Sequence, residues 1–349
     1  MSDYSLAAKA LHHMALGTRA FGRLAFDLER SIFLNSSPRS PLGPHVFVVG
    51  LARAGTTILM RALYGSGQFA SLTYEDMPFV LCPNMWSRFS RSSVRTRPAQ
   101  ERAHGDGIFV DVSSPEALDE VFWRVFAREP YIKDDGLYPY APCRETVASF
   151  REYIRLVMRR RQKTRYLSKN NNNILRIQTL WDGFPDAVFL LPIREPVSHA
   201  QSLLAQHRRF LDADRFTVAY MGWLGHHEFG KTHRPFVLGP KLARGSDPSE
   251  LDYWVEQWIQ CYSYLDRALQ DDRERVYFVP YESLCEVAAV WNRIEELTGI
   301  EGTHRPGFKT ASRRAELAYD TDLATSARQL YTDICQRALH RLGIRRVAA

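Results

Sequence analysis

"HVFVVGLARAGTTILMRAL", residues 45–63, is an apolar run that two glycines interrupt and that resumes at helical spacing. The segment Val46–Val49 has the character of a buried strand, and Thr56–Tyr64 has that of a helix. Between them lies Gly50-x-x-x-x-Gly55-Thr56-Thr57. A glycine-rich turn that leads from a strand into a helix N-terminus presents backbone N–H groups to an anion. We therefore predict an anion-binding loop at residues 50–57, and an ordinary glycine turn is the alternative.

The loop departs from a nucleotide-binding P-loop at one position. Thr56 stands where nucleotide triphosphatases carry the lysine that reaches the β- and γ-phosphates, and Arg53 lies inside the loop. A γ-phosphate and its Mg²⁺ would therefore lack their main cationic partner. Arg53, the hydroxyls of Thr56 and Thr57, and the loop amides suit a less highly charged group.

Strands and helices alternate along most of the chain. This alternation favours a parallel sheet with helices on both faces, so we predict one α/β domain with helical appendages. The expected strands are Val46–Val49, Tyr166–Ser168, Val188–Ile193 and Val276–Val279, and the expected helices are Thr56–Tyr64, Pro115–Phe126 (with Ser114 as its N-cap), Glu145–Arg161 and a helix from Pro196.

Residues 4–33 are predicted to form one or two amphipathic helices that pack onto the domain. Contact with a membrane surface through Lys9, Arg19 and Arg23 is the alternative. The apolar face that we expect to be covered consists of Leu6, Leu11, Met14, Phe21, Leu24, Leu28 and Ile32.

A second candidate anion site lies in "LLPIREPVSHAQSLL", residues 190–204. Arg194 follows an apolar strand at its carboxyl end, where ligands of open α/β sheets bind. If Pro196 begins a helix, Ser198 and Ser202 lie one turn apart on the same face. One guanidinium with nearby hydroxyl groups would suit a phosphate dianion.

Together the two motifs resemble those of the sulfotransferases. The loop of that family reads G-x-x-R-S-G-T-T, and this chain differs from it by Ala54 in place of the usual serine. The family's 3′-phosphate motif is Arg-Asp/Glu-Pro with a serine eight positions beyond the arginine, and Arg194 and Ser202 match that spacing. Similar segments extend the resemblance from about Val46 to Leu284, including "RYLSKNNNN" and "VYFVPYESL".

The resemblance implies a three-layer fold like that of the P-loop nucleotide hydrolases. It implies a single sulfotransferase domain over residues 1–349, with N-terminal helices at 1–34, a nucleotide-binding core at 45–284 and a helical C-terminal region at 285–349. The implied sulfuryl donor is 3′-phosphoadenosine 5′-phosphosulfate (PAPS), used without a metal. Its implied contacts are Arg53, Ala54, Gly55, Thr56 and Thr57 at the 5′-phosphosulfate, Arg194 and Ser202 at the 3′-phosphate, and Tyr281, for which core packing is the alternative.

Two further residues are candidates for catalysis. Glu75 in "SLTYEDMPF" matches, within a residue, the catalytic glutamate of tyrosylprotein and some glycan sulfotransferases, so the chain resembles these more than the histidine-base, cytosolic type. Asp76 and His104 are the alternative bases, and a helix cap or surface acid is the alternative for Glu75. Lys169 matches the family's strand-end lysine, which would stabilise charge on the transferring group. A surface lysine on the asparagine-rich turn is the alternative for Lys169.

The composition indicates a globular protein. Its basic charge suits a protein that handles anions, and an ordinary solvated surface is the alternative. The 349 residues carry a net charge of +7, and no nucleic-acid-binding signature accompanies it. The five cysteines lack CxxC spacing and are interpreted as reduced thiols. Neither an apolar run long enough for a membrane span nor a signal peptide is recognisable, so a cytoplasmic location is expected.

The acceptor is left open by the sequence. The segment "GHHEFGKTH" gathers His226, His227, Glu228 and His233 without HExxH spacing, so we expect it to line the acceptor site and not to bind a metal. Segments 76–125 and 205–240 are expected to build that site, for a glycan, a phenol or a lipid head group. A P-loop kinase-like phosphotransferase and a non-catalytic nucleotide-binding module are the rival functions.

Overall fold

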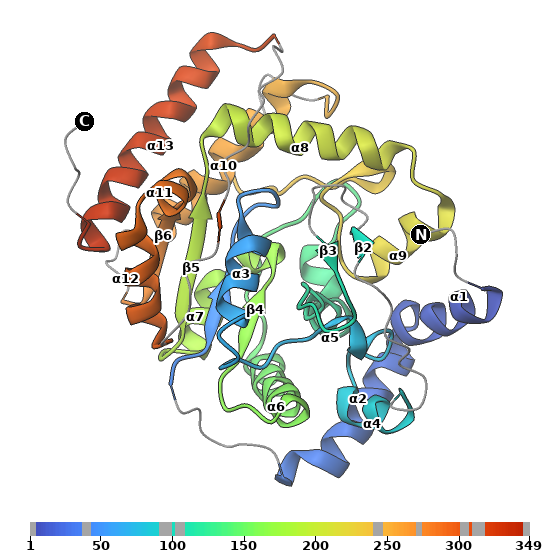
Figure 1. The fold of residues 1–349 in the computed structure, drawn as a ribbon. Coiled ribbons are helices and arrows are strands. Elements are labelled where there is room, and N and C mark those ends of the chain that lie inside the picture. The colour runs from blue at the N-terminus through green and yellow to red at the C-terminus, as the bar shows by residue number, and fades with distance from the viewer. Residues whose placement is uncertain are drawn as a thin grey trace.

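A four-stranded parallel sheet lies at the centre of the computed structural model, which describes residues 5–36, 43–90, 100–101, 109–239, 247–269, 274–300, 307–308 and 318–344. The strands run in the order β4-β1-β5-β6 (Figure 1). Their bounds are β1 Val46–Val48, β4 Leu167–Lys169, β5 Val188–Ile193 and β6 Val276–Pro280. A short antiparallel pair, β2 Gln100–Glu101 and β3 Phe109–Val110, is separate from this sheet. The predicted parallel sheet is confirmed.

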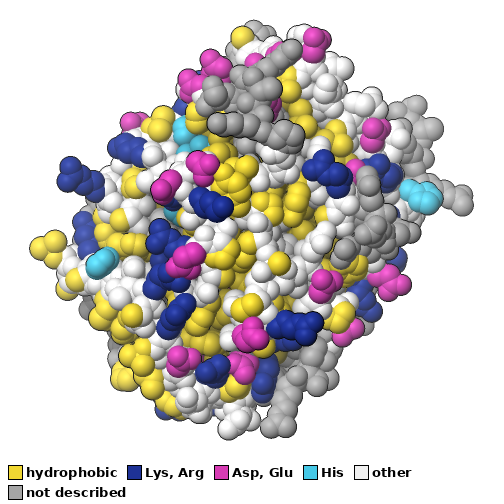
Figure 2. Space-filling model, turned by 180° about the vertical axis from the view of Figure 1, so that it is seen from behind, with side chains coloured by type: hydrophobic (Ala, Val, Ile, Leu, Met, Phe, Trp, Pro, Cys, Tyr) yellow, Lys and Arg dark blue, Asp and Glu magenta, His cyan; other side chains and the backbone are white. Residues whose placement is uncertain are grey.

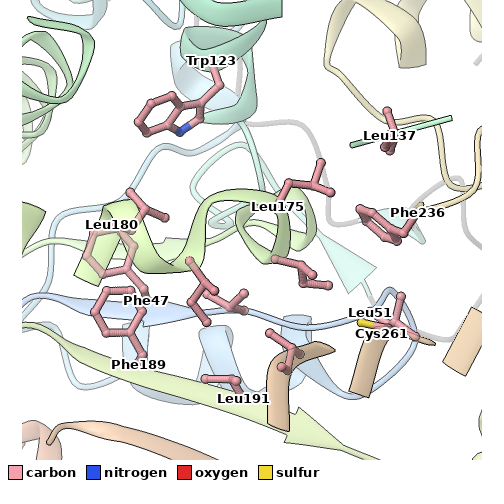
Figure 3. Close-up of a cluster of buried hydrophobic side chains, with 14 of the residues drawn as sticks. Phe47, Leu51, Trp123, Leu137, Leu175, Leu180, Phe189, Leu191, Phe236 and Cys261 are labelled. Atoms are coloured by element: carbon pink, nitrogen blue, oxygen red, sulfur yellow. The ribbon is translucent and has the colours of Figure 1, made fainter. Parts of the chain in front are cut away.

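Alternate residues of the strands face opposite layers of helices, as the period of two in a strand requires. Phe47, Phe189 and Leu191 pack with α5, α6 and α7 on one face, and Figure 3 shows the side chains of this core. On the other face, Val48 and Leu190 pack with α3 and α12. The three-layer α/β architecture expected from the resemblance is therefore present, with both faces of the sheet covered.

Helices cover the sheet, and further helices lie at both ends of the chain (Figure 1). None of those in the described ranges is long and apolar enough to cross a membrane. The helices are α1 Leu6–His12, α2 Arg19–Phe33, α3 Thr56–Tyr64, α4 Pro83–Ser90, α5 Glu120–Tyr131, α6 Arg144–Arg161, α7 Ile177–Gly183, α8 Pro196–Leu211, α9 Arg215–Trp223, α10 Leu251–Leu269, α11 Tyr281–Glu286, α12 Ala288–Thr298 and α13 Thr321–Arg341.

The helix predicted at Pro115–Phe126 begins five residues later than expected, at Glu120. Pro115 instead forms an antiparallel bridge with Thr73, and the N–H of Glu116 donates to the carbonyl of Leu72 at 3.2 Å. Ser114 does not cap the helix, because its hydroxyl is bonded to Asp111. Pairing with a distant segment has therefore overridden a local helix-start signal.

The N-terminal helices pack onto the domain, but through a different face from the one predicted. Gly22, Ala25, Phe26 and Phe33 are the buried apolar residues of α2. Of the predicted face, only Phe21 is partly covered, while the remaining six side chains are exposed. That prediction was wrong because α2 is apolar on two sides, and because the π-helical segment His13–Gly17 separates α1 from α2.

Candidate active site

The predicted anion loop connects β1 to α3 and contains two residues with left-handed backbone. Arg53 has φ +70° and Gly55 has φ +95°. A side chain at Gly55 would also clash, since an added Cβ would lie 2.4 Å from the ring of Tyr281. Glycine is therefore required here, and Tyr281 lies directly against the loop. The first amide groups of α3 have no acceptors within the helix, so this end of α3 offers donors to an anion.

The second motif lies beside the loop. Arg194 follows β5, the neighbour of β1, and its Nη1 donates to the carbonyl of Arg53 at 3.3 Å. Nε of Arg53 donates to the hydroxyl of Ser202 at 3.1 Å. The guanidinium of Arg194 stands over the ring of Tyr281, 6.0 Å from its centroid. The fold thus brings together two motifs that lie about 140 residues apart in the sequence.

Three other predicted loop residues are enclosed by the protein. Thr56 and Thr57 form the buried start of α3. Ala54 has no exposed surface. A serine hydroxyl at position 54 would therefore point into the protein interior, so its absence takes no donor from the open side of the loop.

Lys169 ends β4, which is the other neighbour of β1. It pairs in register with Val48, so it lies level with the start of the loop, and its surface is only 7% exposed. The asparagines that follow make the turn rigid. The side chain of Asn170 accepts from the amide of Asn172 at 3.0 Å, and Asn171 Nδ2 donates to Glu228 at 3.0 Å.

Glu75 and Asp76 lie in a short turn, Tyr74–Asp76, and differ in burial. Asp76 is 1% exposed and forms a capping box with Thr73, whereas the side chain of Glu75 is 26% exposed. Arg161 contacts both carboxylates, with Nη1 2.7 Å from Glu75 and Nη2 2.5 Å from Asp76. Arg160 lies 3.5 Å from Glu75. His104, the alternative base, lies outside the described residues.

The position of this turn follows from the edge of the sheet. Ala70 bridges Tyr166 in parallel register, so the chain beyond Ala70 starts out in the same direction as β4. Burial raises the pKa of the hydroxyl group of Tyr64, the last residue of α3, and the charges of Arg161, Asp76 and Glu75 also act on it, so α3 ends close to this turn. None of the contacts described above joins Glu75 directly to the loop.

Comparison with known proteins identifies the family of this chain. Residues 44–222 match the model of the sulfotransferase family. The chain belongs to the sulfotransferase family. The matched region contains the loop, Glu75, Lys169, Arg194 and Ser202. No curated protein sequence matches the chain.

One solved structure shares the fold of this sulfotransferase. The structure of sulfotransferase STF9 from Mycobacterium avium is 15% identical with a TM-score of 0.50, and the alignment covers 93% of this chain and 83% of that one. Sulfotransferase STF1 from Mycobacterium tuberculosis H37Rv is 13% identical, with a TM-score of 0.46 and coverage of 93% and 82%. At these identities only the similarity of fold to STF9 is informative.

His199 of the sulfotransferase was missed by the sequence reasoning and contacts the loop directly. It lies on α8, has no exposed surface, and its Nε2 is 2.7 Å from the carbonyl oxygen of Ala52. A carbonyl can only accept, so Nε2 carries a proton. Burial lowers the pKa of His199 to about 3, so the ring is neutral. Its spacing, three residues before Ser202 on the same helix, was the available sequence signal.

The resemblance implies that the loop binds the desulfated nucleotide PAP. We then expect His199→Leu to weaken that binding about tenfold, because the buried carbonyl of Ala52 loses its donor. His199→Gln should bind PAP within about threefold of wild type, since the glutamine amide can donate from a similar position. Isothermal titration calorimetry with all three proteins measures the difference. Equal affinities for the Leu and Gln variants would contradict a role for this hydrogen bond.

The same Gln variant tests the protonation state of His199. The pKa of His199 is about 3 in the folded protein and 6.5 in the unfolded chain, so on acidification the unfolded chain takes up the proton first. The stability of wild type should therefore fall relative to His199→Gln by about 2 kcal/mol between pH 7 and pH 5. Urea denaturation at both pH values checks this, and a pH-independent difference would contradict it.

A buried polar cluster braces the end of β4 and was also missed. Asp119 accepts from the hydroxyl of Ser168 at 2.5 Å, and burial raises the pKa of Asp119 to about 6. Glu120 accepts from Asn170 at 2.7 Å and pairs with the fully buried Arg176. The guanidinium of Arg176 is surrounded by the rings of Trp123, Tyr131 and Tyr140. The residues on both sides of Lys169 are therefore held by one network.

The histidine-rich segment lies against the same end of β4. Glu228 accepts from Asn171, His233 Nε2 is 2.6 Å from the hydroxyl of Tyr253, and His227 Nδ1 is 3.1 Å from Arg234. Within the part of the chain that the structure describes, no three His, Cys, Asp or Glu side chains converge as metal ligands would. The segment is thus tied to the turn that follows Lys169.

Proposed function

We propose that this sulfotransferase transfers the sulfuryl group of PAPS to a hydroxyl or amine of an acceptor. The observation that carries this proposal is the junction of the two anion motifs, in which Arg53 contacts both Arg194 and Ser202. A nucleotide phosphorylated at its 3′ and 5′ positions presents two anionic groups to such a pair of sites. Position 56 is a threonine in place of the P-loop lysine, which disfavours binding of a nucleoside triphosphate with Mg²⁺.

The donor supplies an activated sulfuryl group, and the protein supplies orientation and charge. In our proposal Arg53, the loop amides, Thr56 and Thr57 hold the 5′-phosphosulfate, and Arg194 and Ser202 hold the 3′-phosphate. Tyr281 packs beside both and limits where the nucleotide can lie. Fixed donors of this kind stabilise charge that develops in the transition state.

The transfer itself needs a base and a cation. As the acceptor oxygen or nitrogen forms its bond to sulfur, the bond from sulfur to the 5′-phosphate oxygen breaks, and its electron pair remains on the phosphate of PAP. We assign Lys169 to stabilise the charge on that bridging oxygen, and Glu75 to accept the proton of the acceptor. Glu75 is preferred to Asp76 because Asp76 is enclosed in its capping box.

We propose that the acceptor binds beside two segments, the turn after Lys169 and the histidine-rich segment, which are joined by a hydrogen bond. The acceptor itself is best identified by a screen with radiolabelled PAPS. A cytoplasmic location remains a prediction.

We expect PAP in EDTA to raise the melting temperature by roughly 5 °C at about a hundred times its Kd. ATP with Mg²⁺ should raise it less. Arg194→Ala should weaken PAP binding about 10- to 100-fold, because a charge-assisted contact to phosphate is lost. Arg215→Ala, at an exposed position on α9, is the matched control. A larger shift with ATP and Mg²⁺ than with PAP would contradict the proposal and favour a kinase-like activity.

A further inference from the structure

Exposed hydrophobic side chains gather on the N-terminal helices. Leu6 is 85% exposed, Leu24 58% and Ile32 56%, and Phe89 of the adjacent α4 is 71% exposed. We call the following set the N-terminal face: Leu6, Leu11, Met14, Leu24, Leu28, Ile32 and Phe89. Figure 2 shows hydrophobic side chains along the edge of the molecule where α1 and α2 lie, at its lower left.

The outer side of α2 carries a row of apolar residues. The inner side of the same helix packs onto the domain. Leu24, Leu28 and Ile32 are four residues apart, so they form one stripe along the helix. On the inner side, Phe26 packs edge-on against Phe122, Phe126 and Tyr153. Exposure of such an apolar stripe to water is unfavourable, which indicates that the stripe is covered by a binding partner.

A buried carboxylate fixes the angle between α2 and α4. Glu29 has no exposed surface, and it accepts from the backbone amides of Asn84 and Met85 at 2.7 and 2.9 Å. Because these amides belong to the first turn of α4, Glu29 caps that helix from α2. The two helices therefore present their outer residues together as a fixed surface.

The charge around the N-terminal face is positive. Residues 5–36 contain four basic and two acidic side chains, and one of the acids is the buried Glu29. The other, Asp27, is paired with Arg30 at 3.3 Å. Arg30 also contacts Glu152, and Arg19 is paired with Glu129, so the positive charge that stands out comes from other residues. Arg23 and Arg88 are exposed, and their guanidinium groups lie 5.7 Å from the ring of Phe126 and 4.8 Å from the ring of Phe33. Each cation is exposed next to a residue of the N-terminal face, Arg23 beside Leu24 on α2 and Arg88 beside Phe89 on α4.

We propose that the N-terminal face binds the surface of an anionic lipid membrane, with the axes of α1 and α2 lying along it. Protruding leucine, isoleucine and phenylalanine side chains would enter the boundary between head groups and acyl chains, and Arg23 and Arg88 would contact lipid phosphates. A second copy of the chain fits less well. A two-fold contact through this face would bring the same two exposed cations of both copies into one interface.

The test is co-sedimentation of the full-length protein with vesicles. Vesicles of phosphatidylcholine with phosphatidylglycerol should bind the protein, and pure phosphatidylcholine should bind it at least about fivefold less tightly. The double variant Leu24→Ser, Leu28→Ser should weaken binding about tenfold or more. Arg23→Gln should weaken it about fivefold, with an effect that disappears at high salt. Leu211→Ser, at an exposed leucine on α8 outside the face, should bind like wild type.

Two outcomes would overturn the proposal. One is binding that is equal for both kinds of vesicle and unchanged in the Leu24, Leu28 double variant. The other is a concentration-dependent dimer in analytical ultracentrifugation that the same double variant abolishes, because the occupant would then be a second copy. The PAP-induced rise in melting temperature should be the same in wild type and in all these variants, which shows that they fold and separates this test from that of the proposed function.

Discussion

Replacing Glu75 with glutamine is expected to lower kcat about 10²- to 10⁴-fold, which is the usual contribution of a general base. The affinity for PAP should stay within about twofold, since Glu75 has no part in the proposed nucleotide contacts. Steady-state kinetics and calorimetry on the same protein preparation measure both quantities.

A control is needed because Glu75 is also ion-paired. Glu129→Gln removes another carboxylate that is paired with an arginine, Arg19, on the surface of α5. It should leave kcat unchanged. If Glu75→Gln also retains full kcat, the base is Asp76 or His104. If both kcat and PAP affinity fall together, Glu75 acts by holding Arg160 and Arg161 in place.

Replacing Lys169 with methionine is expected to lower kcat about 10²- to 10³-fold, as removal of one preorganised stabilising donor does elsewhere. Methionine fills a similar volume, which matters because Lys169 is only 7% exposed at the end of β4. PAP lacks the sulfuryl group, so its affinity should change less than about fivefold. Single-turnover kinetics with PAPS isolate the chemical step from product release.

Lys133→Met is the matched control, since Lys133 is an exposed lysine and its ammonium group lies over Tyr138 away from the sheet. It should have wild-type kinetics. A Lys169→Met protein with normal kcat and weakened PAP binding would place the ammonium group at the nucleotide phosphates and not at the transferring group.

Much of the fold could be predicted because its strands are continuous apolar runs. Val188–Ile193 was predicted to the residue, and so was the helix Thr56–Tyr64. The start of α5 could not be, since the bridge between Thr73 and Pro115 forms only when distant segments meet. The buried side of α2 could not be read either, because that helix is apolar on two sides and periodicity does not say which side the domain covers.

The site shows the same division between local and distant information. Arg53, Arg194 and Ser202 belong to local motifs, so sequence spacing was enough to select them. His199 and Asp119 act through contacts with Ala52 and Ser168, which lie far away along the chain. The helical spacing of His199 relative to Ser202 indicates which face it lies on but not that its partner is Ala52, and the position of Asp119 before a helix does not indicate Ser168 as its partner. Residues that support a site are therefore harder to predict than residues that form it.

The left-handed backbone of Arg53 has a consequence for engineering this protein. Such a conformation costs a non-glycine residue about 1 kcal/mol, and here hydrogen bonds from Arg194 and His199, which belong to the protein itself, hold the carbonyls of residues 53 and 52. The cost therefore falls on folding, and the loop has little order left to gain when a ligand arrives. A change at this turn that raises thermal stability is expected to lower the affinity for the proposed nucleotide. Stabilising substitutions should therefore be sought outside residues 52–55.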